Sequence, residues 1–384
     1  MRVKAALLHE QPGKWQVDEV EVDEPRQNEV LVRMAFAGLC HSDEHCANGD
    51  IPVPTPFNGG HEGSAIVEAV GPGVTSLEVG DHVVASFVPA CGLCRWCVTG
   101  MGNLCDRGAN ILLGTMADGT YRMSTGGRGV AQGGGLGTFA EYSVFQEASC
   151  IKIADDIPLD AAAVVSCGAS TGWGSAVNAA AVQPGDVVIV MGVGGVGIHA
   201  VQGARHAGAS RIIAVDLVAQ RREIAELCGA TDFTTDIDEA TELARSLTNG
   251  QGADSAIVTV GVLDGRCIAQ AFAAIRKGGT VVVTAQGSAT VEGIPVNLFE
   301  LSMYQKRIQG VLFGMDAPRR QIPRLLQMYQ AGQLKLDELI TRRYRLEEIN
   351  QGYEDLLAGR NVRGLLDFTT SGAGARSTSE AAPS

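Results

Sequence analysis

The sequence predicts an α/β protein in which a β-rich part is followed by a doubly wound parallel sheet. Three observations predict this fold class. Short stretches of alternating apolar and polar residues fill the first 150 positions, strand and helix patterns alternate from about residue 184, and a glycine-rich turn follows the first buried strand of that second part. The chain has 384 residues, which is enough for two or three domains, and its 45% hydrophobic content can form sizeable cores.

The N-terminal part is typical of short strands joined by turns. Residues 17–25 and 29–38 alternate apolar and polar side chains, as strands with one buried face do. Residues 63–74 and 81–88 repeat the pattern, with Gly-Pro-Gly as a turn. Residues 106–138 are rich in glycine, and we expect them to form a long surface excursion.

Strands and helices alternate in the second part. Continuously apolar stretches, typical of buried parallel strands, lie at 187–191, 211–216, 253–261 and 278–287. Helical patterns follow the first two of them, at 196–208 and 217–230. This order predicts a parallel sheet with right-handed crossovers. The pattern changes again near Phe313, and we expect the small, polar tail 372–384 to be disordered.

A dinucleotide fingerprint opens the first of these helices. The motif G-x-G-x-x-G is formed by Gly192, Val193, Gly194, Gly195, Val196 and Gly197. Such glycines let the backbone turn tightly and approach a pyrophosphate, which then lies at the helix N-terminus. Asp216 ends the next strand, where a carboxylate would accept hydrogen bonds from the adenosine ribose. That charge would repel a 2′-phosphate, so NAD is favoured over NADP, although Arg221 and Arg222 nearby could accommodate such a phosphate.

Four cysteines within fifteen residues predict a closed metal site. Their spacing is C-x2-C-x2-C-x7-C, from Cys91, Cys94, Cys97 and Cys105. Tetrahedral zinc takes four thiolates at this kind of spacing, as structural zinc sites do. An iron–sulfur cluster is the nearest rival, but its bacterial run ends in C-x3-C-P, and here Asp106 stands in place of the proline. Four buried cysteines without a ligand are the remaining alternative.

A second group of residues could form an open metal site. Cys40 and His61 lie in separate loops of the β-rich part, and Cys167 lies close to where the dinucleotide domain begins. Two thiolates and one imidazole leave a fourth zinc position free for water or substrate, a ligand set that the alcohol dehydrogenases are known to use. Taken singly, the cysteines could be small core residues, and His61 could be a hydrogen-bonded loop histidine.

The net charge and the composition argue against some classes of binding partner. The net charge of −13 argues against nucleic acid and against anionic membranes. No apolar run reaches the length of a membrane-spanning helix, and the N-terminus lacks the apolar run of a signal peptide. We therefore expect a cytoplasmic protein, in which ten cysteines serve purposes other than disulfides.

The chain resembles a zinc-dependent medium-chain alcohol dehydrogenase from about residue 3 to 368. The features that carry the resemblance are the Cys40 loop, the run Gly60-His61-Glu62-Gly63, the four-cysteine lobe, the run Cys167-Gly-x-Ser-Thr171-Gly, the glycine fingerprint and Arg363. Within that family it is most similar to the actinobacterial nicotinoproteins that use nitrosodimethylaniline as acceptor and are associated with mycofactocin. Residues 89–109, 117–122 and 136–144 indicate this branch.

The resemblance implies a domain plan and an assembly. It implies a GroES-like catalytic domain at 1–165 and 313–371, carrying the zinc lobe at 91–105, and an inserted Rossmann NAD-binding domain at 166–312. Members form homodimers or homotetramers through sheet edges, which we expect near 258–261 and 281–288. The cofactors implied are two Zn²⁺ per chain and NAD(H).

The resemblance also implies roles for residues of the open site. Zinc on Cys40, His61 and Cys167 would bind the alcohol oxygen, so that hydride can pass to the nicotinamide. Ser42 would take the hydroxyl proton, which a cofactor ribose hydroxyl would pass to His45 for release to solvent.

Further roles concern the surroundings of the metal and the cofactor. Asp43 would orient His61, and Glu62 would ligate the metal transiently. His41 and Arg363 would contact the pyrophosphate, and Thr171 would pack behind the nicotinamide ring. Without the resemblance, Ser42 is also consistent with a turn residue, His45 with a solvated surface histidine, and Glu62 with a structural acid.

Three functions stay open at this stage. In the first, the enzyme oxidises a primary alcohol, keeps its NAD and passes electrons to an external acceptor such as mycofactocin, with residues 106–138 as a lid or docking surface. In the second, NAD exchanges freely and the substrate is an alcohol or a thiol–formaldehyde adduct. In the third, the protein binds NAD or senses metal without catalysis.

Overall fold

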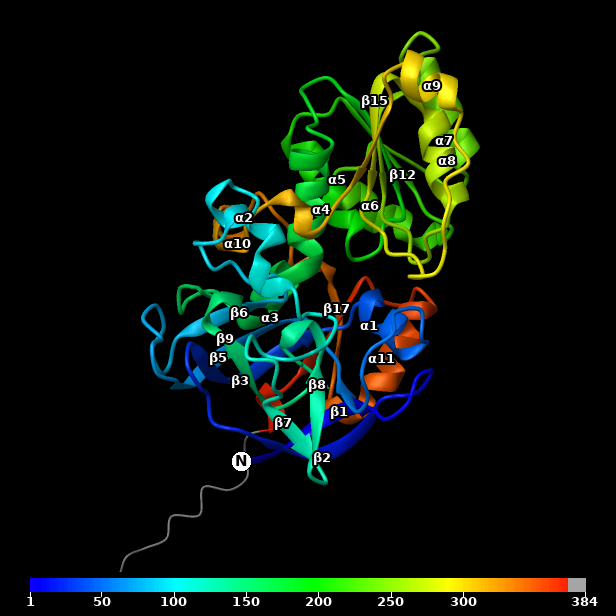
Figure 1. Ribbon diagram of the computed structural model, residues 1–384. Coiled ribbons are helices and arrows are strands. Elements are labelled where there is room, and N and C mark those ends of the chain that lie inside the picture. Colours follow the sequence, from blue (N-terminus) through cyan, green and yellow to red (C-terminus); the bar gives the residue numbers. More distant parts are fainter. Residues whose placement is uncertain (372–384) are drawn as a thin grey trace, which may run out of the picture.

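The computed structural model describes residues 1–371 and has two lobes (Figure 1). One lobe is β-rich, and the other is a parallel sheet flanked by helices, so the predicted α/β fold class is confirmed. The predicted disordered tail, 372–384, lies outside the described residues. Among residues 1–371, no helix is both long enough and apolar enough to cross a membrane.

The β-rich lobe contains a closed barrel, ordered β1-β2-β7-β8-β4, and a seven-stranded sheet, ordered β10-β6-β5-β3-β18-β17 with β9 paired to β3. Its N-terminal strands are β1 (Arg2–Leu8), β2 (Gln16–Val22), β3 (Glu29–Gly38), β4 (Phe57–Asn58), β5 (Glu62–Val70) and β6 (His82–Ser86). Its other strands are β7 (Met123–Thr125), β8 (Arg128–Gln132), β9 (Tyr142–Gln146), β10 (Cys150–Lys152), β17 (Ile340–Tyr344) and β18 (Arg363–Asp367). Since β18 pairs antiparallel with β3, the C-terminal segment returns to complete this lobe.

The glycine-rich stretch 106–138 is only partly a surface excursion. Its strands β7 and β8 belong to the barrel, and Met123 and Val130 are buried in the same core as Val3. The expectation of a surface excursion is therefore wrong for the buried residues of β7 and β8 and for 136–138, whereas the hairpin turn 126–129 is exposed. Two glycines with positive φ make the β7–β8 hairpin turn, and such short strands between glycines show little alternation.

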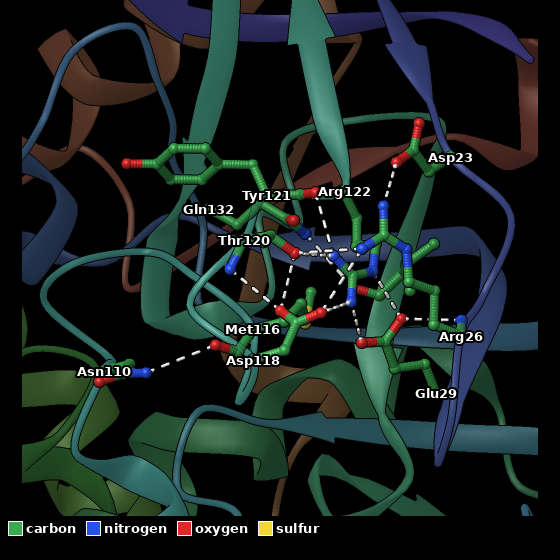
Figure 2. A network of polar contacts seen from close by, with 11 residues as sticks. Asp23, Arg26, Glu29, Asn110, Met116, Asp118, Thr120, Tyr121, Arg122 and Gln132 are labelled. Atoms are coloured by element: carbon green, nitrogen blue, oxygen red, sulfur yellow. Dashed lines mark hydrogen bonds and ion pairs between the residues drawn. The ribbon is translucent and has the colours of Figure 1, made fainter.

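A buried ion pair anchors this stretch to the centre of the lobe (Figure 2). The Nε and Nη2 atoms of Arg122 donate to the two carboxylate oxygens of Glu29 at the start of β3, at 2.7 and 2.6 Å, and the Arg122 side chain is only 1% exposed. Arg122 also donates to Asp118 at 2.8 Å. The loop before β7 is thus held to β3 by one buried carboxylate, that of Glu29, whereas Asp118, 45% exposed, belongs to the loop itself.

The second lobe is a six-stranded parallel sheet ordered β13-β12-β11-β14-β15-β16, the order of dinucleotide-binding sheets. Its strands are β11 (Val187–Met191), β12 (Arg211–Val215), β13 (Asp232–Thr234), β14 (Ala253–Val258), β15 (Ile275–Val283) and β16 (Arg307–Gly310). The edge strand next to β15 is β16, and the segments 258–261 and 281–288, which we expected near the edge, lie at and beyond the ends of the inner strands β14 and β15.

Helices cover both faces of the parallel sheet and the ends of the lobes (Figure 1). The first six α-helices are α1 (His41–Ala47), α2 (Arg95–Val98), α3 (Leu159–Val164), α4 (Ser170–Gly174), α5 (Gly197–His206) and α6 (Arg222–Cys228). The others are α7 (Ile237–Leu247), α8 (Gly265–Ala274), α9 (Leu298–Met303), α10 (Pro318–Gln330) and α11 (Ile349–Leu357).

A continuous helical run links the lobes. It passes from α3 through a π-helical turn at Val165–Ala169 into α4 and a second π turn at Ser175–Ala179, so the predicted domain boundary at 165/166 falls inside it. Gly172 allows close packing, because a Cβ there would lie 2.0 Å from the carbonyl oxygen of Val196 at the start of α5. The run therefore brings the Cys167 turn against the glycine fingerprint.

Candidate functional site

Four side chains from three separate segments converge at the base of the cleft between the lobes. One ligand atom each of Cys40, His61, Glu62 and Cys167 lies within 4.8 Å of every other, and all four residues are buried. Cys40 lies between β3 and α1, His61 directly precedes β5, Glu62 begins β5, and Cys167 lies in the π turn. A π turn widens the helix locally and often marks a functional site.

Asp43 determines which nitrogen of His61 is free. The Nδ1 of His61 is 3.1 Å from the Oδ2 of Asp43, and the other Asp43 oxygen accepts a hydrogen bond from the Gly60 backbone at 2.9 Å. Burial disfavours a charged His61 ring, but the nearby Asp43 and Cys40 outweigh it and raise the pKa of His61 well above its ordinary value. Because Nδ1 faces a carboxylate, Nε2 is left to bind a metal.

The two thiols of the cluster have opposite protonation tendencies. The neighbouring Cys167 thiol lowers the pKa of Cys40 well below its ordinary value, whereas Cys40 together with burial raises the pKa of Cys167. The hydroxyl oxygen of Ser42 lies 3.6 Å from the Cys40 sulfur. A thiolate is therefore favoured at Cys40 even before a cation is added, as a metal ligand needs.

Glu62 and Arg363 form a fully buried ion pair behind this cluster. Arg363 Nη2 donates to Glu62 Oε2, while Glu62 Oε1 has no hydrogen-bond partner within the described part of the chain. Burial raises the pKa of Glu62 to about 7, against the opposing effect of Arg363. A cation bound beside this unpartnered oxygen, the two thiols and the imidazole would therefore be stabilised.

Cys40, His61 and Cys167 thus fit a zinc ion. Two sulfurs and one imidazole nitrogen lie close enough together to bind a single ion, and a carboxylate oxygen of Glu62 lies beside them. The same residues line the cleft, so a fourth position would face the ligand space.

The four-cysteine lobe fits a second zinc ion. The sulfurs of Cys91 and Cys97 are 4.0 Å apart, and those of Cys94 and Cys105 are 3.8 Å apart. Four sulfurs at about 2.3 Å from one tetrahedral ion would be separated by about 3.8 Å. These separations are far longer than a disulfide bond of about 2.05 Å.

Backbone amides prepare some of these sulfurs for a cation. Cys91 Sγ accepts from the backbone N–H groups of Leu93 and Cys94, at 3.4 and 3.3 Å. Backbone N–H groups of Asp106 and Cys97 lower the pKa of Cys94 to about 6, whereas burial raises the pKa of Cys105 to about 12. A metal would therefore displace protons from part of the cluster on binding.

The glycine fingerprint forms a tight turn from β11 into α5, as the sequence predicts. A Cβ on Gly197 would lie 1.8 Å from the carbonyl oxygen of Gly192, and Gly192 has a positive φ of 86°. At Gly194 the nearest atom to such a Cβ is 3.6 Å away, so a ligand can approach the backbone there. Gly195 and Val196 complete the turn and line the same cleft.

Asp216 and two arginines surround this turn. Asp216 accepts from the backbone N–H groups of Val193 and Val218, at 2.8 and 2.9 Å, and from Arg221 at 2.8 Å. A Cβ on Gly195 would lie 2.7 Å from Arg363 Nη1. The Nε atoms of Arg221 and Arg363 are buried and have no partner within residues 1–371. These two arginines border the glycine turn and could donate hydrogen bonds to the phosphates and the ribose of a dinucleotide bound there.

Both predicted sites open onto one cleft of about 880 Å³. Thr171, Ser42, His41 and His45 also line it. Burial lowers the pKa of His41, so its ring is neutral at neutral pH in the absence of an anion. The cleft is therefore lined by the open-site and cofactor residues that the sequence suggested, apart from Glu62, which belongs to the ligand cluster, and Val193 and Gly197, which belong to the glycine turn.

Several residues that line the cleft were not predicted from the sequence. They include the apolar residues Ile51, Val53, Phe57, Phe87, Ile111, Leu112, Leu312 and Phe313. They come from five separate segments, and nothing in their local patterns marks them. For Thr259, Val260 and Gly261 a signal existed, because they follow the carboxyl end of a buried parallel strand, where ligands of such sheets bind.

Residues 26–155 match the family described as the alcohol dehydrogenase GroES-like domain, and residues 195–331 match the zinc-binding dehydrogenases. The chain is 48% identical over 368 residues to an NDMA-dependent alcohol dehydrogenase of Amycolatopsis methanolica, covering 95% of this chain and 99% of that one. It is 45% identical over 371 residues to alcohol dehydrogenase B of Mycobacterium tuberculosis, covering 96% and 99%.

Solved structures agree with these relationships. A zinc-binding-domain alcohol dehydrogenase of Burkholderia ambifaria superposes with a TM-score of 0.89 at 33% identity, covering 96% of this chain and 99% of that one. Benzyl alcohol dehydrogenase of Acinetobacter calcoaceticus gives 0.88 at 30% identity, with the same coverage.

Proposed function

We propose that this chain, which belongs to the zinc-dependent medium-chain alcohol dehydrogenase family, oxidises a primary alcohol with an NAD that stays bound between turnovers. The observation that carries the proposal is the shared cleft. The Cys40–His61–Cys167 cluster and the glycine fingerprint line the same 880 Å³ space, so a substrate at the metal would face a cofactor at the turn.

Zinc held by Cys40, His61 and Cys167 would supply the Lewis acid that lowers the pKa of an alcohol hydroxyl. Asp43 orients His61 for that role through the 3.1 Å contact to Nδ1. Ser42, at 3.6 Å from the Cys40 sulfur, is close enough to this position to accept the hydroxyl proton. His45 also lines the cleft and would release that proton to water. We propose that Glu62 ligates the metal transiently, since it belongs to the cluster and its Oε1 has no hydrogen-bond partner among the described residues.

NAD would supply the hydride acceptor. We propose that Asp216 holds the adenosine ribose and that Arg221 and Arg363, which border Gly194 and Gly195, bind the pyrophosphate together with His41, which lines the same cleft beside Gly261. Thr171 lines the same cleft from α4, directly after the π turn, and we propose that it packs behind the nicotinamide ring. We propose that the second zinc is held by Cys91, Cys94, Cys97 and Cys105 and serves the structure of the lobe.

The name of the Amycolatopsis relative supports the retained cofactor and an external acceptor, for which a mycofactocin-like carrier is a candidate. An apolar cleft wall suits a primary alcohol with a hydrocarbon chain or ring. We also propose the domain division 1–165 with 313–371 and 166–312, a homodimer or homotetramer, and a cytoplasmic location, for which ten unpaired cysteines are typical.

Cofactor retention is the decisive measurement. The protein is purified without added nucleotide, gel-filtered at length, and its reduced-nicotinamide absorbance is recorded while primary alcohols are added. Turnover is then measured with nitrosodimethylaniline alone and with NAD alone. We expect bound nucleotide, about two zinc ions per chain, and turnover on the dye without added NAD.

The same experiment separates the alternatives. An empty protein that turns over only with added NAD would be a conventional dehydrogenase, acting on alcohols or thiol–formaldehyde adducts. A protein that binds zinc and NAD but reduces no acceptor with any alcohol would be a non-catalytic sensor, and the proposed function would be wrong.

A further inference from the structure

We propose that Asp50 is a positioning residue for proton release: its carboxylate holds His45 so that Nε2 of the ring faces the cleft, and it balances the charge of the ring once that nitrogen has accepted a proton. The inference rests on the proposed function, in which His45 carries the proton of the alcohol away. It adds a residue that neither the sequence nor the relatives pointed to.

The contacts of His45 define which nitrogen can act. Its Nδ1 is 2.9 Å from Oδ2 of Asp50, and its Nε2 is 3.2 Å from the carbonyl oxygen of Gly261. Both partners are acceptors only, so each contact is a hydrogen bond only when the ring nitrogen on that side carries a proton. A ring that has accepted a second proton could therefore make both contacts at once and join the β-rich lobe to the parallel-sheet lobe.

In the neutral ring, Asp50 selects the tautomer. A carboxylate can only accept, so Nδ1 keeps its proton and the lone pair remains on Nε2. That lone pair would face the Gly261 carbonyl, which repels it, and the ring is satisfied only when a hydroxyl in the cleft donates to it. Nε2 then accepts one proton, the imidazolium forms beside the Asp50 carboxylate, and one proton returns to water.

The side chains of His45 and Asp50 differ in their exposure to solvent. The side chain of His45 is 7% exposed, whereas that of Asp50 is 39% exposed. The pair therefore connects a buried ring in the cleft with solvent, unlike a surface ion pair with both members in water. The hydrogen bond from His45 also lowers the pKa of Asp50, which keeps the carboxylate ionised.

The local backbone holds Asp50 in this place. Gly49, with a positive φ of 87°, ends helix α1 and turns the chain back toward His45. The Ile51 N–H donates to the carbonyl of His45 at 3.0 Å, and the Asp50 N–H donates to Asn48 Oδ1 at 3.0 Å. Gln11 bonds the next turn of the loop, accepting from the Val53 N–H at 2.9 Å.

The charges around the ring come from few groups. Glu44 and His41 of the same helix interact electrostatically with His45, and Asp50 is in direct contact with it. The parallel-sheet lobe presents the Gly261 carbonyl to the ring, and the Ala289 N–H donates to the Asp50 carbonyl at 3.3 Å. Asp50 is therefore the carboxylate in direct contact with the ring.

The test uses Asp50→Asn in the full-length holoenzyme and follows reduction of the bound nicotinamide by an alcohol in a single turnover from pH 6 to 9.5. We expect the rate to fall about tenfold near pH 6.5 and to return to within about twofold of wild type near pH 9.5, where hydroxide replaces the relay. Asp50→Glu, which keeps the carboxylate, is expected to restore most of the rate.

Asp18→Asn is the matched control, since Asp18 pairs with His9 at 2.6 Å on the exposed surface of the β-rich lobe, outside the cleft lining. It is expected to keep the wild-type pH profile. A double variant with His45→Gln is expected to be no slower than His45→Gln alone, because Asp50 acts through the ring.

Three outcomes would overturn the inference: an unchanged pH profile in Asp50→Asn, a loss of rate that is equal at every pH, or additive losses in the double variant. Zinc content and bound nucleotide of each variant establish that the fold is retained. A wild-type protein without any alcohol-dependent reduction would instead overturn the proposed function, and this inference with it.

Discussion

The guanidinium of Arg363 contacts the carboxylate of Glu62 at the interface between the metal-ligand cluster and the cofactor turn, and their side chains are 3% and 0% exposed. Glu62 is one of four candidate ligands, whereas Arg363 Nη1 borders Gly195 of the glycine fingerprint. One buried ion pair thus joins the two sites whose cooperation the reaction needs. Removing either partner leaves an unpaired charge in the interior, which costs about 3–5 kcal/mol.

This pair makes Arg363→Gln a test of both sites. We expect bound nucleotide to be lost at least tenfold faster on gel filtration, because one phosphate donor is removed and Glu62 is left unpaired. Arg360→Gln is the control, since Arg360 is 54% exposed and pairs with Asp355. Nucleotide retention equal to wild type would show that Arg363 does not hold the cofactor.

Removing one thiolate from the cluster tests the catalytic metal. We expect Cys40→Ala to contain one zinc ion per chain instead of two and to turn over about a thousandfold more slowly, the equivalent of several kcal/mol. Cys46→Ala on the same helix is the control, because burial raises the pKa of that thiol to about 12 and it is not a ligand candidate. Elemental analysis and dye reduction are the measurements, and full turnover in Cys40→Ala would eliminate the site.

The four-cysteine lobe should contribute stability rather than chemistry. Its Asn103 side chain donates to the Leu312 carbonyl at 3.0 Å, so the lobe braces the segment before α10. We expect Cys94→Ser to lose one zinc ion and to lower Tm by about 5 °C, while the remaining metal still supports turnover. Leu93→Ser, at an 83% exposed position in the same lobe, is the control. Loss of turnover with both zinc ions retained would contradict a structural role.

The parallel-sheet lobe could be predicted from sequence because its signals are local. Strands such as Val187–Met191 are buried on both faces and therefore read as unbroken apolar runs, and the fingerprint follows directly. The four-cysteine cluster is local as well. The strands β7 and β8 could not be predicted, since three and five residues between glycines carry too little periodicity, and their place in the barrel depends on pairing with distant strands.

The open site could be predicted only in part for the same reason. Single residues such as Cys40, His61 and Cys167 have ordinary structural explanations, and it was the family resemblance that joined them. Contacts such as that between His45 and the Gly261 carbonyl span 216 positions and depend on how the lobes pack. Asp50 and the apolar lining carry no local signal, so they became visible only in the structure.

The buried Arg122 network gives the last prediction, which concerns stability and its pH dependence (Figure 2). Arg122→Met is expected to lower the free energy of unfolding by about 3 kcal/mol, because Glu29, itself nearly buried, loses its partner. Burial of Asp118 opposes its charge, but hydrogen bonds from Thr120 and Arg122 outweigh that and hold the pKa of Asp118 well below its ordinary value.

A carboxylate with a depressed folded-state pKa stabilises the fold above its unfolded-state pKa of about 3.9, and this stabilisation is lost as the pH falls through the folded-state value. The cost of Arg122→Met, measured by urea unfolding, should therefore be equal at pH 5.5 and pH 8 and shrink only below about pH 4. Arg26→Met is the control, since Arg26 meets Asp118 at 3.5 Å with a 53% exposed side chain, and it should cost less than about 1 kcal/mol. An equal cost for both variants would mean that the network is held by surface contacts and not by its buried arginine.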